Sequence, residues 1–577
     1  MKYHKHIPSA RRATVLVAGL LFFSGFAVIK DDLFLISKNL DIFSAVYRQI
    51  SLNYVDETDP NTLIKTAVDA MLNELDPYTE YVVEADVEAY KLKYVDTKYG
   101  GIGASVFERD GSIFIAELFA GHPAARAGLQ PGDELISING TALRRKSSAA
   151  VSQLLRGGEN SAIRLMVRKP GREDAELLVL TRAVVRQPNV SYEGLLAEGV
   201  GYIKLDKFLE HAAKEVEEAL HGLAKEAELK GLILDLRNNG GGIVQEAVKI
   251  VNLFVPEGEL VVSQKGKNVT KTHSFRTTAK PIALDIPLVV LINRHSASAA
   301  EIVAGALQDL DRAVVIGERS FGKGLVQQTF NLPYHNMVKV TVAKYYTPSG
   351  RCIQSLDFVH RDSSGEFTRL PDSLINAFST KKGRVVYDGS GIFPDIAVEK
   401  PPYHAITKDL LSKYLVFDYA TNFKREHARI PDASNFEIDD MQYADFIRFL
   451  EGKNYHYSSR TAEVLRQLVE LAEEEKNPDE VLLELRTLAQ KVSHSKQQDL
   501  INHQKELKEV LGSEIASRYY HRKGRISFSF KHDHQLQRAI ALLGTTHNEY
   551  YSILAGEGQY KIIGRPEALL AVAETAD

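Results

Sequence analysis

Ser298 stands at a position where a hydroxyl group could act as a nucleophile. It lies between an apolar run at 288–293, which predicts a strand, and a run of helix formers that begins at Ala299. The first residues of a helix carry free backbone amides and a partial positive charge. A serine there could attack a carbonyl carbon while the adjacent amide stabilises the resulting oxyanion. The residues from Ser298 to Glu301 also fit a capping box, so a purely structural role for this serine stays open.

Lys323 is the second residue whose setting suggests chemistry, because it stands between Gly322 and Gly324 immediately before an apolar run. The glycines take up little space, so the ammonium group could lie in a tight site. Burial lowers the pKa of a lysine by disfavouring its charged form, and the neutral amine can act as a general base. Gln327 follows near the same face and could hydrogen-bond the lysine. A solvated lysine in a turn is the alternative.

A third candidate is the glycine turn of Gly240, Gly241 and Gly242, which follows an apolar run that ends at Leu236. Bare backbone amides at the end of a buried strand could complete an oxyanion hole or bind a phosphate. A phosphate loop is excluded, because no Lys-Ser or Lys-Thr pair follows and the glycine spacing of dinucleotide sites is missing. His295 is another candidate base for Ser298, although its place beside the strand end makes the serine oxygen awkward to reach.

The composition argues against several other kinds of chemistry and of partner. The 18 histidines are scattered and no His-Glu-x-x-His motif occurs, so we predict no metal site and no cofactor. The single cysteine, Cys352, cannot form an intrachain disulfide. Lysine and arginine number 71 against 75 aspartates and glutamates, and the net charge of −4 gives no support for nucleic-acid binding.

Strands and helices alternate through the region that holds these candidates. Apolar runs predict strands at 200–205, 232–236 and 288–293, and amphipathic runs predict helices at 211–230, 243–254 and 299–310. Alternation of this kind, with strands that are apolar along their whole length, favours an α/β layer around a largely buried sheet.

The other regions differ in texture. Short strands at 112–116 and 162–167 flank a small helix at 124–127, and helix formers dominate 463–475 and 479–492. We therefore divide the chain into 1–30, a signal peptide or membrane anchor; 31–95, a helical region; 96–183, short strands with glycine turns; 184–404, the α/β region; and 405–577, a helical extension.

The N-terminus predicts export. Basic residues precede an uncharged, mostly apolar stretch at 13–29, and Lys30, Asp31 and Asp32 follow it. This charge pattern places the N-terminus inside and the remainder outside a membrane. A buried core helix is the alternative. In a bacterium we expect a periplasmic protein, released or anchored in the inner membrane.

Several short motifs together resemble the carboxyl-terminal processing proteases, also called tail-specific proteases. The resemblance covers about 40–400 and consists of the segments LDPYT at 75–79, YGGIG at 99–103, GLQPGD at 128–133, DLRNN at 235–239, SASA at 296–299, GKGLVQ at 322–327, YTPSGR at 346–351 and PDI at 394–396. It implies an α/β multidomain fold, with a Clp-protease/crotonase-like core and an inserted PDZ domain at 96–183.

The same resemblance assigns roles to the candidate residues. It implies that Ser298 is the nucleophile, Lys323 the general base and Gln327 its orienting partner. It also implies an oxyanion hole made by the amide of Ala299 and one glycine of the turn, Gly241 or Gly242. Gly240 stands where the family commonly has proline, which predicts a more mobile loop.

A PDZ domain binds an extended chain by adding it as a strand to an open sheet edge. We expect the turn of Gly100, Gly101, Ile102 and Gly103 to present amides to a terminal carboxylate. A helix with Val151, Leu154 and Leu155 at suitable spacing would line a groove for apolar tails, and a helix that only caps the domain is the alternative.

These features predict an exported serine endopeptidase that captures proteins by apolar C-termini. A catalytically inactive PDZ scaffold or chaperone-like binding protein is the first rival, and a crotonase-like acyl-CoA enzyme is the second. An adaptor protein, a homo-oligomer and membrane anchoring stay open as partners or settings.

Overall fold

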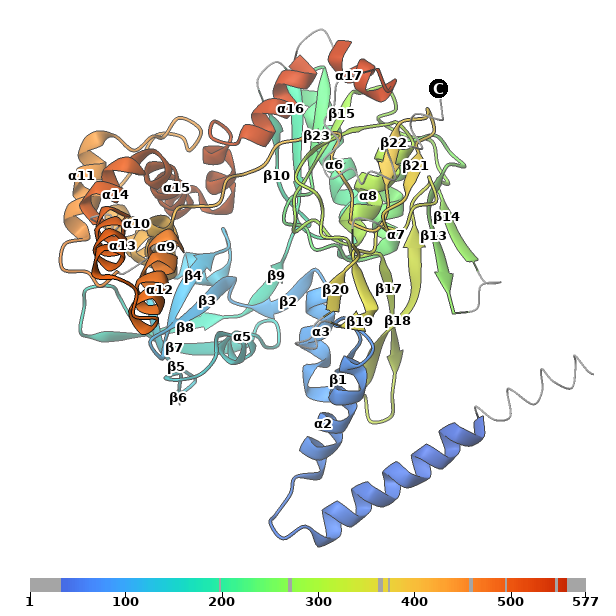
Figure 1. Cartoon of the computed structure of the whole chain (residues 1–577), viewed down its shortest axis with the longest axis horizontal. Helices are drawn as coiled ribbons and strands as arrows, with labels where there is room; N and C mark the ends of the chain where they lie inside the picture. Colours follow the sequence, from blue (N-terminus) through green and yellow to red (C-terminus); the bar gives the residue numbers. More distant parts are fainter. Residues whose placement is uncertain are drawn as a thin grey trace, which may run out of the picture. The chain divides into compact units, whose positions relative to one another are not determined.

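The computed structural model is drawn in Figure 1. It describes residues 33–196, 199–267, 272–361, 367–371, 374–455, 460–492, 496–544 and 548–557. The apolar segment at 13–29 lies outside these residues, and no helix within them is long and apolar enough to span a membrane. The described residues fall into two compact units, one made of 33–84 and 327–341 and the other of the remainder.

The first unit combines helices with part of an antiparallel sheet. A helix over 33–53 precedes α2 (Pro60–Asn73), as the spacing of apolar residues predicts. Asp59 caps α2 by accepting hydrogen bonds from two amides of its first turn. β1 (Glu80–Val82) pairs with the first residues of β18 (Met337–Tyr346), and β17 (Leu325–Asn331) also pairs with β18.

Residues 98–186 of the second unit, called the PDZ-like domain below, form a small sheet with its own core. The strand order is β3-β4-β5-β7-β8, so β3 is an edge strand, and α5 packs beside it. β2 pairs with β9 where the chain enters and leaves the domain. The bounds are β2 Lys98–Gly101, β3 Ala104–Arg109, β4 Ser112–Leu118, α4 Pro123–Arg126, β5 Glu134–Ile138, β6 Thr141–Ala142, α5 Ser148–Leu155, β7 Ala162–Arg168, β8 Ala175–Thr181 and β9 Ala183–Arg186.

The predicted α/β region contains a mostly parallel sheet, the central sheet, in the order β10-β11-β12-β15-β16-β23. β10 runs antiparallel to β11, and the other neighbours are parallel. Every residue of β12, β15 and β16 is buried, which explains the unbroken apolar runs in the sequence. The bounds are β10 Val190–Leu195, β11 Val200–Leu205, β12 Gly231–Asp235, β15 Leu288–Ile292, β16 Val314–Gly317 and β23 Ile396–Ala397.

Two layers of helices cover the central sheet, and alternate strand residues face each layer. Leu288, Val290 and Ile292 of β15 pack in the core under α6, α7 and α8. Val289 and Leu291 pack in a second core with α16 and α17, from the far end of the chain (Figure 1). The bounds are α6 Ala212–Glu226, α7 Val244–Asn252, α8 Ala299–Asp309, α16 His534–Gly544 and α17 Asn548–Leu554. The last two helices of the predicted extension, α16 and α17, therefore form one of the two layers that cover the central sheet.

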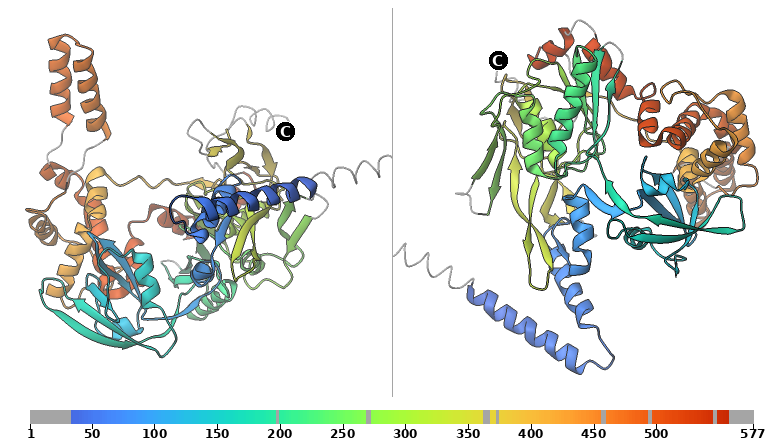
Figure 2. Two further views of the ribbon diagram at one scale, coloured as in Figure 1. Left: turned by 90° about the horizontal axis from the view of Figure 1, so that it is seen from below. Right: turned by 180° about the vertical axis from the view of Figure 1, so that it is seen from behind.

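The rest of the extension, residues 405–529, forms a helical domain with a separate core. Its α12 and α13 pair as a hairpin that projects from the domain (Figure 2). The bounds are α9 Ala405–Ser412, α10 Leu415–Glu426, α11 Asp440–Phe449, α12 Arg460–Glu474, α13 Asp479–Val492, α14 Lys496–Asn502 and α15 Gln504–Ser529. Phe107 of β3 stacks on Tyr414 with ring centroids 4.4 Å apart, so the helical and PDZ-like domains are in contact.

Short strands and one further helix complete the second unit. β13 pairs with β14 and with residues 343–346 of β18. β19 pairs with β20, and β21 pairs with β22. The bounds are α3 Val87–Tyr94, β13 Leu260–Gly266, β14 Thr272–Arg276, β19 Leu356–Arg361, β20 Phe367–Arg369, β21 Ala377–Ser379 and β22 Val385–Tyr387.

Candidate active site

Ser298 is the N-cap of α8 and has a strained backbone, with φ of 56° and ψ of −115°. A residue with a Cβ atom rarely adopts a positive φ, and such strain costs about 1–3 kcal/mol that the surrounding structure must offset. The turn from β15 into α8 is therefore sharp, and a sharp strand-to-helix turn exposes a nucleophile at the end of a sheet. No feature of the sequence beyond the small neighbours Ala297 and Ala299 signals this strain.

A buried carboxylate joins the segment of Ser298 to that of Lys323. Oε2 of Glu301 accepts the backbone N–H of Ser298 at 2.8 Å and that of Lys323 at 2.9 Å. Because both bonds end on one oxygen, the two backbone nitrogens are less than two hydrogen-bond lengths apart. Oε1 accepts the N–H of Gly322 at 2.7 Å and the hydroxyl of Ser320. Glu301 thus positions the start of α8 against the loop that carries the lysine.

Two opposing effects act on the pKa of the Glu301 carboxyl: its burial and the hydrogen bonds that it accepts. It is fully buried, and burial raises the pKa of its carboxyl, while the bonds from Ser320, Lys323, Gly322 and Ser298 act in the opposite direction. The spacing from Ser298 to Glu301 predicts the contact between these two residues, as in a capping box. It does not predict the contacts of Glu301 with Ser320, Gly322 and Lys323.

Tyr345 of β18 makes a second link between the same two segments. Its hydroxyl lies 3.2 Å from the carbonyl oxygen of Ser298 and also hydrogen-bonds the carbonyl oxygen of Lys323. The side chain is almost completely buried, so this link is shielded from water. Nothing in the sequence singles Tyr345 out, because its partners are backbone atoms of distant segments.

The glycine turn meets the start of α8 at Gly241. A Cβ atom on this residue would lie 2.8 Å from the Ala299 nitrogen, and its φ is 89°, so only glycine fits. Gly242 turns toward Phe208 instead, where a Cβ atom would lie 2.4 Å from the carbonyl oxygen. A Cβ atom on Gly240 would meet nothing within 4 Å, so this position has room for a side chain.

The backbone N–H groups of Ala299 and Gly241, which the predicted oxyanion hole requires, differ in their hydrogen-bond acceptors. Ala299 is the first residue of α8, so its N–H has no preceding helical turn to donate to. The N–H of Gly241 donates to Oδ1 of Asn239 at 2.8 Å. The Gly241 amide must therefore exchange Asn239 for the substrate before it could bind an oxyanion.

A network of buried charged side chains lies where β12 leads into the glycine turn. Arg237 pairs with Asp235 at 2.6 Å and with Asp533, just before α16, at 2.7 Å. Lys204 adds a bond of 3.1 Å to Asp235 and one of 2.6 Å to the carbonyl oxygen of Arg237. Burial alone would raise the pKa of Asp235, but Arg237 and Lys204 outweigh it and keep that pKa well below its ordinary value.

The predicted catalytic residues and the candidate base His295 differ in their exposure to solvent. Lys323 is half-buried, as is Ser298. The side-chain amide of Gln327, in the first unit, donates to the hydroxyl of Thr341 at 3.3 Å. His295 is exposed in the turn before α8. Among the described residues, no group of three or more histidines, cysteines or acids could hold a metal ion.

The predicted peptide groove divides into turn and helix residues. Gly100 and Gly101 lie in β2, Ile102 is buried, and Gly103 has a φ of 74° that suits glycine. Of the helix residues, Val151 and Leu155 turn inward and pack in the core of the PDZ-like domain, because α5 places both on the face toward the sheet.

Leu154 differs from Val151 and Leu155 in α5, because the residue is 36% exposed. It lies on the helix that packs beside the edge strand β3. The open edge of β3 and this leucine are therefore the accessible features on this side of the domain.

Comparisons with known proteins match three parts of the chain. The model of peptidase family S41 matches residues 199–360, a PDZ domain model matches 114–169, and the model "Probable PDZ-protease, C-terminal helical domain" matches 406–543. A probable CtpA-like serine protease of Staphylococcus aureus (strain COL) is 30% identical over 400 residues, which are 68% of this chain and 72% of the relative.

Two further similarities complete the comparison. The carboxy-terminal processing protease CtpB of Bacillus subtilis (strain 168) is 34% identical over 319 residues, 55% of this chain and 66% of the relative. The solved structure of a photosystem II D1 C-terminal processing protease is 26% identical, covering 65% of this chain and 96% of that one, with a TM-score of 0.33.

Proposed function

The chain belongs to peptidase family S41, among the carboxy-terminal processing serine proteases that carry a PDZ domain, and on this basis we propose that it is an exported endopeptidase with a Ser298–Lys323 catalytic dyad. The observation that carries the proposal is the double link between the backbones of the two residues, through the carboxylate of Glu301 and the hydroxyl of Tyr345. The strained backbone of Ser298 supports the same role.

The proposed reaction begins when Oγ of Ser298 attacks the scissile carbonyl carbon and the neutral amine of Lys323 takes its proton. The oxyanion is bound by the N–H of Ala299 and by the N–H of Gly241 after it leaves Asn239. The ammonium of Lys323 then protonates the leaving amine, and an acyl-enzyme forms. Lys323, neutral again, takes a proton from a water molecule, which attacks the ester carbon, and the ammonium returns this proton to Oγ of Ser298 as the bond to the acyl group breaks. Gln327 is proposed to orient the lysine.

Substrate capture is assigned to the PDZ domain. We propose that a protein's C-terminal segment adds as a strand to the open edge of β3, with its carboxylate at the amides of 100–103 and an apolar side chain against Leu154. The substrates are then proteins or peptides with apolar C-termini. The proposed fold of the catalytic part is a Clp-protease/crotonase-like core, which the mostly parallel central sheet covered by helices supports.

Loss of cleavage in two single variants tests the dyad. With an unfolded protein that ends in three apolar residues as substrate, we expect Ser298→Ala to lower kcat by about 10⁴-fold or more, because the attacking oxygen is gone. Lys323→Ala should lower it by about 10²–10⁴-fold, the usual contribution of a general base. Ser274→Ala and Lys280→Ala, at exposed positions, are the matched controls and should cleave like wild type.

The outcomes separate the rival functions. Equal cleavage by wild type and Ser298→Ala would contradict the proposal. Binding of the apolar tail without turnover in wild type would favour the scaffold, in which case neither variant changes the affinity.

Export is tested separately on the mature protein. The segment at 13–29, with basic residues before it and acidic residues after it, supports processing or anchoring during export. Intact-mass analysis of the protein from a bacterial host should show loss of the first 25–30 residues or recovery with the membrane fraction. A full-length chain found in the cytosolic fraction would contradict export.

A further inference from the structure

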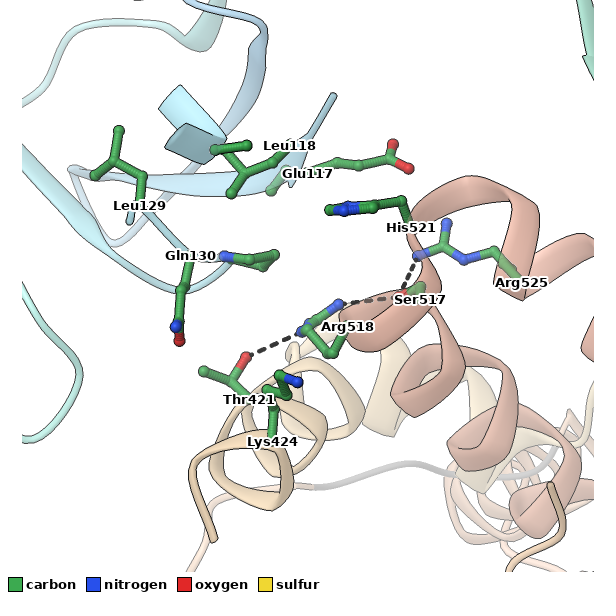
Figure 3. A pocket seen from close by; sticks show the side chains of 13 residues that line it. Glu117, Leu118, Leu129, Gln130, Thr421, Lys424, Ser517, Arg518, His521 and Arg525 are labelled. Carbon is green, nitrogen blue, oxygen red and sulfur yellow. Dashed lines mark hydrogen bonds between the residues drawn. The ribbon is translucent and has the colours of Figure 1, made fainter. Parts of the chain in front are cut away.

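A cavity of about 200 Å³ lies within the second unit, between the PDZ-like domain and the helical domain (Figure 3). Leu118, Leu129 and Pro131 of the PDZ-like domain form an apolar wall. The cavity lies beside β4 and α4, whereas the proposed peptide groove lies at the edge of β3 beside α5. It is therefore a site that the proposed function does not use.

The opposite wall is cationic. Lys424 of α10 and Arg518 and Arg525 of α15 line the cavity, and Figure 3 shows their side chains around one space. Glu117 is the one carboxylate among the lining residues. Thr421 and Ser517 add hydroxyl groups. The lining thus carries a surplus of positive charge and hydrogen-bond donors, which is the chemistry that binds anions.

Arg518 is the most deeply placed of these cations, with 8% of its surface exposed. It pairs with Glu514 at 2.8 Å, and its other bonds, to Ser517, Phe417 and Thr421, are 3.1, 3.3 and 3.4 Å long. Glu514 also pairs with Arg525 at 3.0 Å and does not line the cavity. The carboxylate of Glu514, which lies outside the cavity lining, therefore pairs with the guanidinium groups of both Arg518 and Arg525.

Burial disfavours the charged form of two of the cations that line the cavity. Burial lowers the pKa of Arg518, and the charge of Glu514 only partly restores it. Burial likewise lowers the pKa of Lys424. A negative group in the cavity would stabilise both cations, since an opposite charge at close range favours the charged form.

The break in α15 contributes to the shape of the cavity. His521 has a φ of 53° and a ψ of −149°, which interrupts the helix between Arg518 and Arg525. The side chain of His521 lines the cavity and points toward the wall of Glu117 and Leu118 in Figure 3. A regular helix through this point would carry the second arginine away in a different direction.

We propose that this cavity binds a small molecule with two or more negative charges on phosphate or carboxylate groups. Its volume suits a small molecule, and the apolar wall accepts a short carbon skeleton. Three cations line the space against Glu117 in the lining and Glu514 behind it, so positive charge remains in excess and favours an anion. The two walls come from different domains that already touch through Arg109 and Asp418, 3.0 Å apart. A bound anion therefore also strengthens the contact between the PDZ-like and helical domains.

Calorimetric titration of the full chain at low salt tests the site, with inorganic pyrophosphate and citrate as probes. Wild type should bind one of them saturably with one site per chain, and the probe that binds tells phosphate from carboxylate chemistry. Arg525→Gln and Lys424→Gln should each weaken binding by about tenfold or more. Arg522→Gln and Lys523→Gln make the same charge change at exposed positions of α15 outside the lining and should bind like wild type.

Thermal unfolding with and without the probe is a second test, which shows that each variant is folded and does not depend on peptidase activity. The bound probe should raise the thermal unfolding midpoint of wild type and of the two control variants by equal amounts, and that of either cavity variant by clearly less at the same probe concentration. No saturable binding of either probe at millimolar concentration would overturn the proposal. Equal binding by all five proteins would also overturn it, because the anion would then be held by general surface charge.

Discussion

Glu301→Gln is expected to lower kcat by about a hundredfold with little change in KM. The carboxylate accepts the backbone amides of Ser298, Gly322 and Lys323 and the hydroxyl of Ser320. Glutamine has the same shape but one acceptor oxygen, so its amide group must face two of these donors. The start of α8 and the lysine loop then separate, and a displacement of about 1 Å costs roughly that factor in rate.

Glu246→Gln is the matched control, because Glu246 is also a buried glutamate that accepts a backbone amide, that of Ala213 at the start of α6. Both substitutions should lower the free energy of unfolding, by about 1–3 kcal/mol for each donor left unpaired. Only Glu301→Gln should lower kcat selectively. If the two variants lose kcat to the same extent at matched folded fractions, Glu301 is structural only and the positioning role is wrong.

Removal of α16 and α17 is expected to unfold the central sheet. Seven strand residues, Val200, Tyr202, Ile233, Val289, Leu291, Val314 and Ile316, are buried in the core that these helices cover. Burial of a large apolar side chain is worth about 1.5–3 kcal/mol, so exposing all of them costs about 10–20 kcal/mol, as much as the whole net stability of about 5–15 kcal/mol of an ordinary domain. A chain that ends at residue 530 should be insoluble or lack a cooperative unfolding transition.

A point variant separates this effect from gross truncation. Leu542 of α16 is fully buried against the sheet, so Leu542→Ala should lower the free energy of unfolding in urea by about 2–5 kcal/mol. Leu488 of α13, a residue that is 47% exposed, is the control, and Leu488→Ala should change that free energy by less than about 0.5 kcal/mol. Equal effects of the two substitutions would show that α16 is dispensable for the sheet.

Local patterns in the sequence predicted most elements of the α/β region. The runs at 200–205, 232–236 and 288–293 correspond to β11, β12 and β15 within one residue at either end. These strands are buried on both faces, so their apolar character is continuous and easy to recognise. The amphipathic runs likewise became α6, α7 and α8.

Which helices cover which face could not be predicted in the same way. The spacing of apolar residues shows that a helix has a buried side, and it carries no information about the partner. For this reason the sequence places α16 and α17 in the helical C-terminal extension, whereas the structure packs both on the central sheet. The same limit applies to Val151 and Leu155, for which the sequence leaves a groove lining and a structural cap open, and which pack in the core of the PDZ-like domain.

The chemical types at the candidate site can be recognised from neighbouring residues alone: a serine before a helix, a lysine between glycines and a turn of bare amides. How these groups approach one another depends on the folded chain. The carboxylate of Glu301, the hydroxyl of Tyr345 and the close approach of Gly241 to Ala299 each join segments that are distant in the chain. Such contacts exist once the central sheet has placed the strand ends side by side, since side-chain and backbone hydrogen bonds act over about 3 Å.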